Sequence, residues 1–148
     1  MSTSEGIVVG IDGSDGGQRA MRFALNEARL RHSPLHVVMA YDLPWQTYNA
    51  VPGLDVEQLM TDLREDAQRR LRDAVEAVSG ESSGVQVTSE AIEGAPAQVL
   101  VARSAAAALL VVGSRGLGGF RGLLLGSVGH QCAQHARCPV VIVPAPRD

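Results

Sequence analysis

The sequence predicts an α/β fold of three layers, in which helices cover both faces of a five-stranded parallel sheet. Short runs rich in Val, Ile and Leu alternate with stretches whose apolar residues recur every three or four positions, as is typical of parallel βα units. The 148 residues contain neither an internal repeat nor a linker-like stretch, and their number suits one domain. We therefore expect a single domain over residues 1–148.

Five runs are expected to form the strands of the sheet. Each is bounded by turn-forming residues and is apolar at most positions, as expected for strands that are buried on both faces. The expected strands are Ile7–Ile11, Leu35–Tyr41, Val85–Ile92, Ala108–Gly113 and Pro139–Val143.

Four stretches with helical periodicity lie between these strands. The most regular is Asp55–Ser79, and the others are Asp15–Arg31, Gly94–Ala106 and Ser127–Ala136. Pro96 suits a first helical turn, and Asp15 is expected to be an N-cap. The segment Asp42–Leu54 contains two prolines and a glycine and is predicted to be a long loop. Its rings at Trp45 and Tyr48 are expected to pack beneath the loop, or else to cap a ligand or a partner surface.

The basic residues restrict the function. The net charge is −3, and all thirteen basic residues are arginines. A Walker-type P-loop needs a lysine beside the phosphates, and Schiff-base enzymes need a lysine amine, so both classes are excluded. The arginines are scattered through an acidic chain, which argues against a nucleic-acid or membrane-surface partner.

Cysteine content and hydropathy indicate a cytoplasmic protein without a structural metal. Two cysteines do not make a disulfide scaffold, and no apolar run reaches the roughly 20 residues of a membrane span. His130, Cys132, His135 and Cys138 superficially resemble zinc ligands, but residues 130 and 132 are about 200° apart around a helix. We expect no protein metal site there and a packed thiol at Cys132.

A glycine-rich segment after the fourth strand carries the clearest chemical signal. Gly113-Ser-Arg-Gly116 ends that strand, and nine residues later Gly126-Ser127 begins a helix. Glycines permit close approach of a ligand to the backbone, and free N–H groups at a helix start bind anions. Arg115 and Arg121 could add positive charge. In a doubly wound sheet the ligand lies beyond the carboxyl ends of the strands, here near Asp12–Ser14 and the glycine segment.

This spacing, Gly-x2-Gly-x9-Gly-Ser, resembles the ATP-binding motif of the universal stress protein family. The resemblance extends over nearly the whole chain, through Ile7–Ser14, Leu35–Asp42, Gly94-Ala-Pro96 and the closing Pro139–Val143. It implies a Rossmann-like sheet of strand order 3-2-1-4-5, similar to the adenine nucleotide alpha hydrolases. Many members carry an acidic residue where this chain has Ala108, at the end of the strand remote from the site.

The resemblance also implies roles for individual residues. Asp12 would hold the ribose hydroxyls or the adenine side of the site, and Ala40 would offer backbone hydrogen bonds to adenine. Phosphates would lie at the glycine segment with a Mg²⁺ or Mn²⁺ ion. The residues that the resemblance places at ATP are Asp12, Gly13, Ser14, Ala40, Val112, Gly113, Ser114, Arg115, Gly116, Gly126, Ser127 and Val128.

The resulting hypothesis is an ATP-binding stress-response or signalling module rather than a dedicated enzyme. No histidine lies in Asp12–Ser14 or Ser114–Leu125 to activate water, so slow hydrolysis at most is expected. The resemblance implies a homodimer that pairs through Val140–Val143, an apolar run suited to an edge strand. Three alternatives stay open: a slow Mg²⁺-dependent ATPase, a member that prefers cyclic AMP, and a partner-binding scaffold in which nucleotide is incidental.

Overall fold

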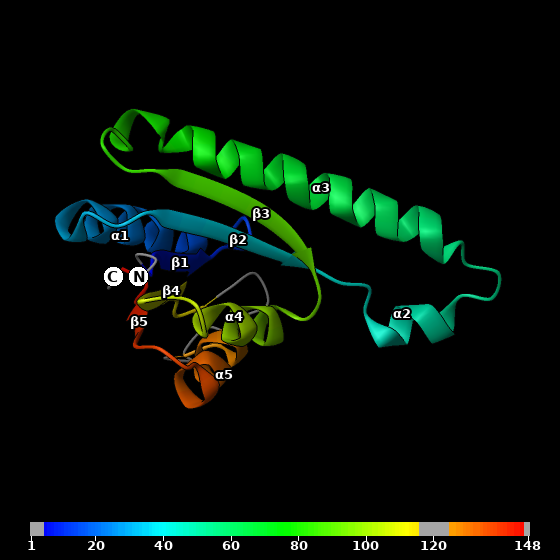
Figure 1. The fold of residues 1–148 in the computed structure, drawn as a ribbon. Coiled ribbons are helices and arrows are strands. Elements are labelled where there is room, and N and C mark those ends of the chain that lie inside the picture. The colour runs from blue at the N-terminus through cyan, green and yellow to red at the C-terminus, as the bar shows by residue number, and fades with distance from the viewer. Residues whose placement is uncertain (1–4, 116–124, 147–148) are drawn as a thin grey trace.

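A parallel sheet of order β3-β2-β1-β4-β5 forms the centre of the molecule (Figure 1), as the sequence predicts. The computed structural model describes residues 5–115 and 125–146, with only the backbone described at positions 45 and 48. The strands are β1 Ile7–Gly10, β2 Leu35–Tyr41, β3 Val87–Glu93, β4 Leu109–Gly113 and β5 Val140–Val143.

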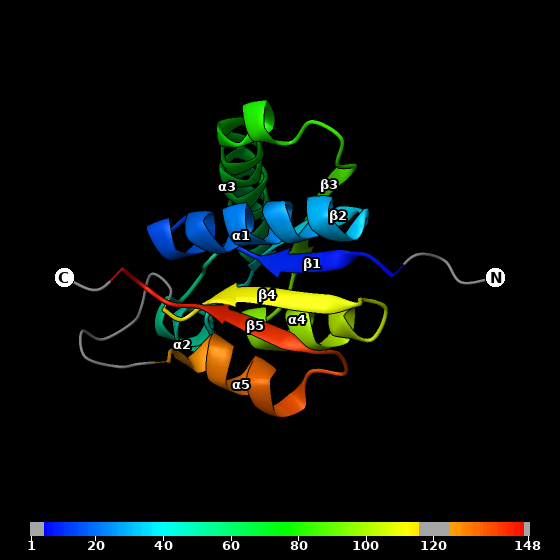
Figure 2. The ribbon, with the colours of Figure 1, turned by 90° about the vertical axis from the view of Figure 1, so that its left-hand side faces the viewer.

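The two faces of the sheet are covered by different helices, which gives three layers (Figure 2). One face packs against α1 and α3, and the other against α4 and α5. Side chains alternate between the two cores along each strand, so that Ile7 and Val9 join the first core while Val8 joins the second. The helices are α1 Asp15–Arg31, α3 Val56–Ala77, α4 Pro96–Ser104 and α5 Ser127–His135.

The central strand β1 defines where the topology reverses. It pairs in parallel with β2 on one side, through Gly10 and Val38, and with β4 on the other, through Val9 and Val111. The chain leaves β1 toward β2 and β3, and returns across the sheet to β4 and β5. The carboxyl ends of β1 and β4 are therefore adjacent at the switch point, where a doubly wound sheet binds its ligand.

The structure corrects the expected loop Asp42–Leu54, because part of it is helical. Helix α2 spans Trp45–Ala50 and begins after Pro44, whose carbonyl accepts the Thr47 N–H at 3.0 Å. Proline before the first turn fixes φ and needs no N–H there, so a short helix can start even inside a segment rich in turn residues. The expected packing of Trp45 and Tyr48 lies outside the described side chains.

Other boundaries differ from the prediction by one or two residues. Strand β3 begins at Val87 instead of Val85, because Gly84 adopts φ +82° and the Val85 N–H closes a turn on the Ser82 carbonyl. Helix α3 ends at Ala77 and is followed by a 3₁₀ turn, Ser79–Glu81. Strand β1 ends at Gly10, and α4 and α5 end at Ser104 and His135. Such end differences leave the architecture unchanged.

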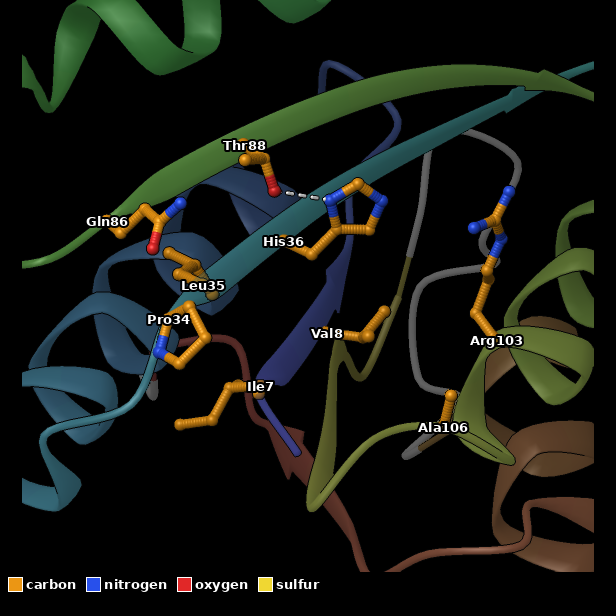
Figure 3. Close-up of a pocket in the computed structure, with 10 residues that line it drawn as sticks. Ile7, Val8, Pro34, Leu35, His36, Gln86, Thr88, Arg103 and Ala106 are labelled. Carbon is orange, nitrogen blue, oxygen red and sulfur yellow. Dashed lines mark hydrogen bonds between the residues drawn. The ribbon is translucent and has the colours of Figure 1, made fainter. Parts of the chain in front are cut away.

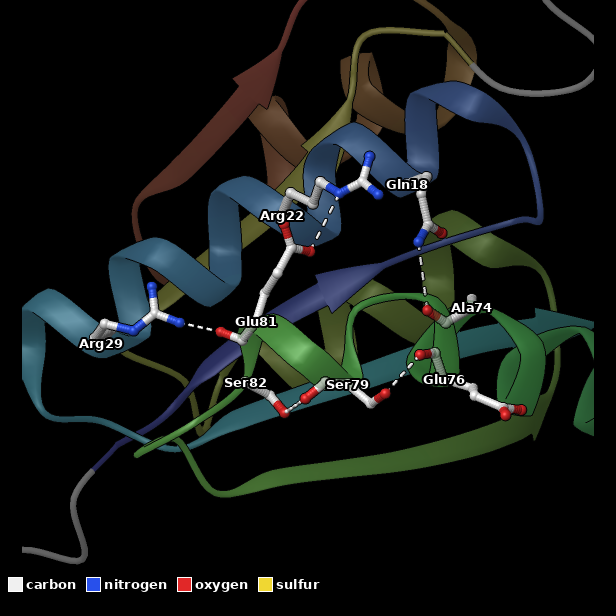
Figure 4. A network of polar contacts seen from close by, with 8 residues as sticks. All are labelled: Gln18, Arg22, Arg29, Ala74, Glu76, Ser79, Glu81 and Ser82. Carbon is white, nitrogen blue, oxygen red and sulfur yellow. Dashed lines mark hydrogen bonds and ion pairs between the residues drawn. The ribbon is translucent and has the colours of Figure 1, made fainter.

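Polar contacts tie α1 to the end of α3 (Figure 4). Gln18, one turn into α1, donates to the Ala74 carbonyl at 3.3 Å. Further along α1, Arg22 pairs with the Glu81 carboxylate at 3.4 Å, and Arg29 donates to the Glu81 carbonyl. The exposed ion pair itself contributes little to stability. Together the contacts join α1 to the last turn of α3 and to the 3₁₀ turn that follows it.

Candidate functional site

A doubly wound sheet places its ligand crevice outside the carboxyl ends of the strands at the switch point, here at β1 and β4. The edge of this crevice is formed by backbone rather than by side chains. A Cβ placed on Gly113, the last residue of β4, would lie 3.0 Å from the Gly16 carbonyl oxygen. A Cβ placed on Gly16 would lie 2.7 Å from the carbonyl oxygen of Arg115. Glycine at both positions therefore lets the first turn of α1 lie directly against the end of β4.

The start of α5 approaches the same strand end from the other face. The Gly126 N–H donates to the Ser114 carbonyl, and an ideal Cβ on Gly129 would lie 3.6 Å from the Gly113 carbonyl oxygen. The first intrahelical bond runs from His130 N–H to the Gly126 carbonyl at 2.9 Å. The N–H groups of the first turn precede this bond and have no intrahelical acceptor. Two helix N-termini thus converge on the end of β4 and make the crevice electropositive.

Asp12 to Ser14 form the turn between β1 and α1. Asp12 Oδ1 accepts the Ser14 N–H at 3.0 Å and also the Ser14 hydroxyl, while Ser14 Oγ accepts the Gly17 N–H at 3.1 Å. The N-cap is therefore Ser14, and the prediction that Asp15 caps this helix is wrong by one residue. Gly13 adopts φ +87°, a conformation that favours glycine.

Arginines from three elements lie around the crevice. Arg115 follows β4, as the sequence indicates. Arg70 of α3 lies against the turn, with Cδ and Nη1 each 3.6 Å from an ideal Cβ on Gly13, and its Nε pairs with Asp66 at 2.9 Å. Nη2 of Arg19, on α1, lies 3.6 Å from an ideal Cβ on Gly16. Sequence reasoning missed Arg19 and Arg70, because neither belongs to a motif and tertiary packing alone brings them here.

Arg19 carries an unsatisfied donor beside this crevice. Its Nε is buried and has no hydrogen-bond partner among residues 5–115 and 125–146. An arginine N–H removed from water without a partner is costly unless an acceptor is supplied. An anion held at the first turn of α1 would provide such an acceptor.

The remaining predicted residues lie at the same edge with different exposure. Ala40 is half-buried near the end of β2, and Val112 is 3% exposed and packs beneath the crevice. Val128 is half-buried against the same core, and the exposed Ser127 accepts a hydrogen bond from Gln131 at 3.1 Å. Ser114 is buried and its N–H donates to the Val143 carbonyl at 2.9 Å. The predicted contributions of Gly116 and Arg121 lie outside the described residues.

The two thiols differ in their surroundings. Cys132 is fully buried, which confirms the predicted packed thiol, and burial raises its pKa to about 11. Cys138 is partly exposed, and its pKa is raised by burial to a smaller extent. Within the described part of the chain, no three His, Cys, Asp or Glu side chains gather as metal ligands would. No helix there is long and apolar enough to span a membrane.

The fold and the crevice together define the class of the protein. It is a Rossmann-like α/β domain whose helix N-termini and glycines meet at a topological switch point, an arrangement suited to an anionic ligand. The family model described as "Universal stress protein family" matches residues 4–144. The chain belongs to this family.

Relatives and solved structures agree with this assignment. Universal stress protein Rv2623 of Mycobacterium tuberculosis is 38% identical over 146 residues, which cover 96% of this chain and 48% of that protein. The chain thus spans about half the length of the curated relatives it matches first.

Two solved structures of the family contain adenine nucleotides. A universal stress protein in complex with cAMP is 29% identical, has a TM-score of 0.67, and the match covers 98% of this chain and 100% of that one. The universal stress protein from Archaeoglobus fulgidus in complex with dAMP is 26% identical, with a TM-score of 0.63 and coverage of 93% and 96%.

Proposed function

We propose that this chain binds an adenine nucleotide, ATP in the first place, at the crevice between β1 and β4. The observation that carries the proposal is the convergence of the α1 and α5 N-termini on Gly113, where glycines let the two helix starts pack closely against the end of β4. The nucleotides in the two related structures support an adenine nucleotide as the ligand class. Cyclic AMP is the main alternative, because one of those structures contains it.

The proposed pose divides the nucleotide between two sides of the crevice. Adenine lies toward Ala40 on β2, and the sugar toward Asp12. The phosphates lie at the first turn of α5, over Gly126, Ser127 and Val128. The N–H groups of that turn would replace the cation that lysine supplies in a P-loop.

Arginine side chains would supplement these backbone donors. Arg70 lies against the turn at Gly13, Arg115 directly follows β4, and the buried Nε of Arg19 lacks an acceptor among the described residues. Arginine N–H groups form strong, charge-assisted bonds with phosphate oxygens. This set of donors favours a ligand with several negative charges over a neutral nucleoside.

A divalent ion fits this arrangement only as a companion of the phosphates. In the described part of the crevice Asp12 offers a carboxylate, and that carboxylate already accepts two hydrogen bonds from Ser14. Mg²⁺ is commonly held by one or two carboxylates together with substrate phosphates and water. The ion would neutralise phosphate charge, while Asp12 and Ser14 keep the turn in shape for the sugar.

We propose a binding module that retains ATP or hydrolyses it slowly. Rapid hydrolysis needs a group that positions or activates water, and the expected site residues include no histidine. Phosphate release from pure protein, compared with a Gly126→Ala variant, tests this point. Turnover well above background that the variant abolishes would replace the binding module with the slow ATPase. Partner capture that is unchanged in Asp12→Ala and Gly126→Ala variants would favour the scaffold alternative.

The experiment for nucleotide binding uses two neighbouring aspartates. Purified protein is denatured and the released ligand is identified by mass spectrometry, and ATP and cyclic AMP are then titrated calorimetrically into emptied protein. We expect Asp12→Asn to weaken binding about tenfold, since it removes one charge-assisted contact. Asp15→Asn, in the exposed first turn of α1, is the matched control. Nucleotide-free protein that binds neither ligand would overturn the proposal.

We also propose a homodimer that forms through the free edge of β5. Strand β5 is an edge strand, and its four residues are all apolar and half-buried. The Leu110 N–H donates to the Pro139 carbonyl, so the alternation along a parallel strand directs the Val140 N–H away from β4. Val140→Pro removes that outward donor and should convert the dimer to a monomer in sedimentation equilibrium, with an unfolding midpoint that no longer depends on protein concentration. A wild-type protein that is monomeric at all concentrations contradicts the dimer.

A further inference from the structure

A second cavity lies at the opposite end of the sheet from the nucleotide crevice (Figure 3). It has a volume of about 300 Å³, and its floor lies over the amino ends of β1 and β2. Seven residues of β2 at about 3.3 Å each place it roughly 20 Å from the carboxyl edge. Its lining residues are Gly6, Ile7, Val8, Pro34, Leu35, His36, Gln86, Thr88, Arg103 and Ala106.

The cavity exists because this part of the sheet has little helical cover. Helix α4 packs on β1, β2 and β4, and α5 packs on α4 and β5, while neither has more than marginal contact with β3. Parallel sheets are normally covered on both faces. Three residues that pair across β1, β2 and β3 face the space beside the end of α4. They are Val8, His36 and Thr88.

The polar groups of the cavity are mostly engaged with one another. His36 Nδ1 lies 2.6 Å from Thr88 Oγ1, and His36 Nε2 lies 3.2 Å from Glu90 Oε2. Glu90 Oε1 accepts a hydrogen bond from Arg103 Nη2 at 3.0 Å. With both ring nitrogens occupied, His36 presents a flat wall to the cavity rather than a free donor or acceptor.

Two donors are left over for a ligand. Arg103 bonds Glu90 through Nη2, and its Nε and Nη1 N–H groups have no partner among the described residues. The Gln86 amide, on the opposite side of the cavity in Figure 3, likewise has none in that part of the chain. The apolar floor and walls come from Val8, Pro34 and Ala106.

We propose that this cavity is a second ligand site that takes a small amphipathic monocarboxylate. The apolar part of the ligand packs over Val8, Pro34 and Ala106, and its carboxylate binds the free edge of the Arg103 guanidinium. A volume near 300 Å³ is at the lower limit of small-molecule sites, which suits a small ligand. Glu90 already neutralises part of the Arg103 charge, which selects a single negative charge over a phosphate dianion.

The site is separate from the proposed nucleotide site and does not depend on it. The two lie at opposite ends of the strands, and they share no lining residue among those named above. Both ligands can therefore occupy one molecule. The carboxylate could be aromatic or a short acyl chain, because the same flat apolar floor accepts either.

The test is an NMR titration of ¹⁵N-labelled full chain with benzoate and hexanoate, each compared with its uncharged amide. We expect saturable shifts at the amides of Val8, His36 and Thr88, in the presence of ATP as in its absence. The acids should bind about tenfold more tightly than the amides, since only they form the charge-assisted contact. A response to benzoate alone, or to hexanoate alone, identifies the kind of carboxylate and supports the site.

Variants separate the charge from the shape of the cavity. Arg103→Gln should weaken both acids about tenfold and leave the amides unchanged, whereas Ala106→Leu should weaken acids and amides alike. Arg137→Gln, which removes an exposed arginine that does not line the cavity, is the matched control. The proposal is overturned if no acid gives saturable shifts, if amides bind as tightly as acids, if ATP displaces the acid, or if Arg103→Gln has no effect.

Discussion

The two ends of the sheet are built from different parts of the chain. At the carboxyl end, close backbone approaches at Gly16 and Gly113 bring two helix N-termini together, and recognition is expected through N–H groups. At the amino end, side chains of His36, Thr88 and Arg103 form the polar wall over an apolar floor, and Glu90 joins His36 to Arg103. A site made of backbone therefore leaves a glycine pattern in the sequence, whereas a site made of side chains from distant positions does not.

The largest effect is expected where backbone approaches backbone at the carboxyl end. Gly16→Val places a Cβ within 2.7 Å of the Arg115 carbonyl oxygen, so the helix start must shift. We expect the free energy of unfolding, measured by urea denaturation, to fall by about 3 kcal/mol. Gly80→Ala is the control, because its Cβ meets nothing within 4 Å, and it should be neutral or slightly stabilising. Equal losses in both variants would contradict a tight carboxyl end.

The next effect is a loss of stability at high pH caused by the buried thiol of Cys132 in α5. The pKa of Cys132 is raised to about 11, so the folded state keeps its proton while the unfolded state loses it near pH 9. The free energy of unfolding is therefore unaffected by this thiol below pH 9. It falls by on the order of 2–3 kcal/mol as the pH rises to about 11, because the unfolded state loses the proton first. Unfolding free energies of the wild type and Cys132→Val, compared at pH 8 and pH 11, should show a clearly larger loss in the wild type, because the variant keeps only the smaller contribution of Cys138.

Thiol labelling compares the accessibility of the two cysteines directly. Cys138 follows α5 toward the amino end and is partly exposed, whereas Cys132 is fully buried. At pH 8 a thiol reagent should modify Cys138 first, and Cys132 only when the protein unfolds. Equal labelling rates of the two thiols in native protein would show that the interior beneath the crevice is open.

A smaller effect separates helix capping from ligand binding. Ser14 caps α1 inside the crevice, and Asp55 caps α3 by accepting the Gln58 N–H at 3.1 Å. Replacing either with Ala should cost about 1 kcal/mol of stability in thermal or urea unfolding. Only Ser14→Ala should also weaken nucleotide binding, because Ser14, unlike Asp55, hydrogen-bonds to Asp12. The same nucleotide affinity in both variants would show that the turn at Asp12–Ser14 does not contribute to nucleotide binding.

The smallest effect is expected at the amino end. Arg103 and Glu90 form an exposed ion pair, and such pairs contribute between zero and about 1 kcal/mol. Arg103→Gln should therefore change the urea midpoint hardly at all while it weakens carboxylate binding. A large loss of stability would show that Arg103 has a structural role rather than a ligand role.

Much of the fold could be predicted from the sequence, because its signals are local. Apolar runs bounded by turn residues identified all five strands, and Pro96 marked the start of α4. The errors also have local causes. Helix α2 is only six residues long, so its periodicity is too short to detect among prolines and glycines. Ser14 and Asp15 are both good capping residues, and the prediction placed the cap at Asp15, one residue too late.

The candidate site was predictable only in its backbone part. The turn at Asp12 and the glycines at 113 and 126 were identified, since glycine at fixed spacing after a strand has a direct physical meaning. Arg19 and Arg70 were not, because their approach to Gly16 and Gly13 depends on how α1 and α3 pack on the sheet. The cavity at the amino end combines segments between residues 6 and 106, and no short motif contains it.

By itself, the sequence determined the strands, most helices, the strand-end turns and the absence of lysine from any anion site. These properties follow from neighbouring residues along the chain: periodicity, β-branching, and the conformational freedom of glycine. Tertiary structure alone decided which side chains share a space, such as Arg70 with Gly13 and Arg103 with Glu90. The physical reason is that such contacts arise from helix and strand packing over long separations, where no single residue carries the signal.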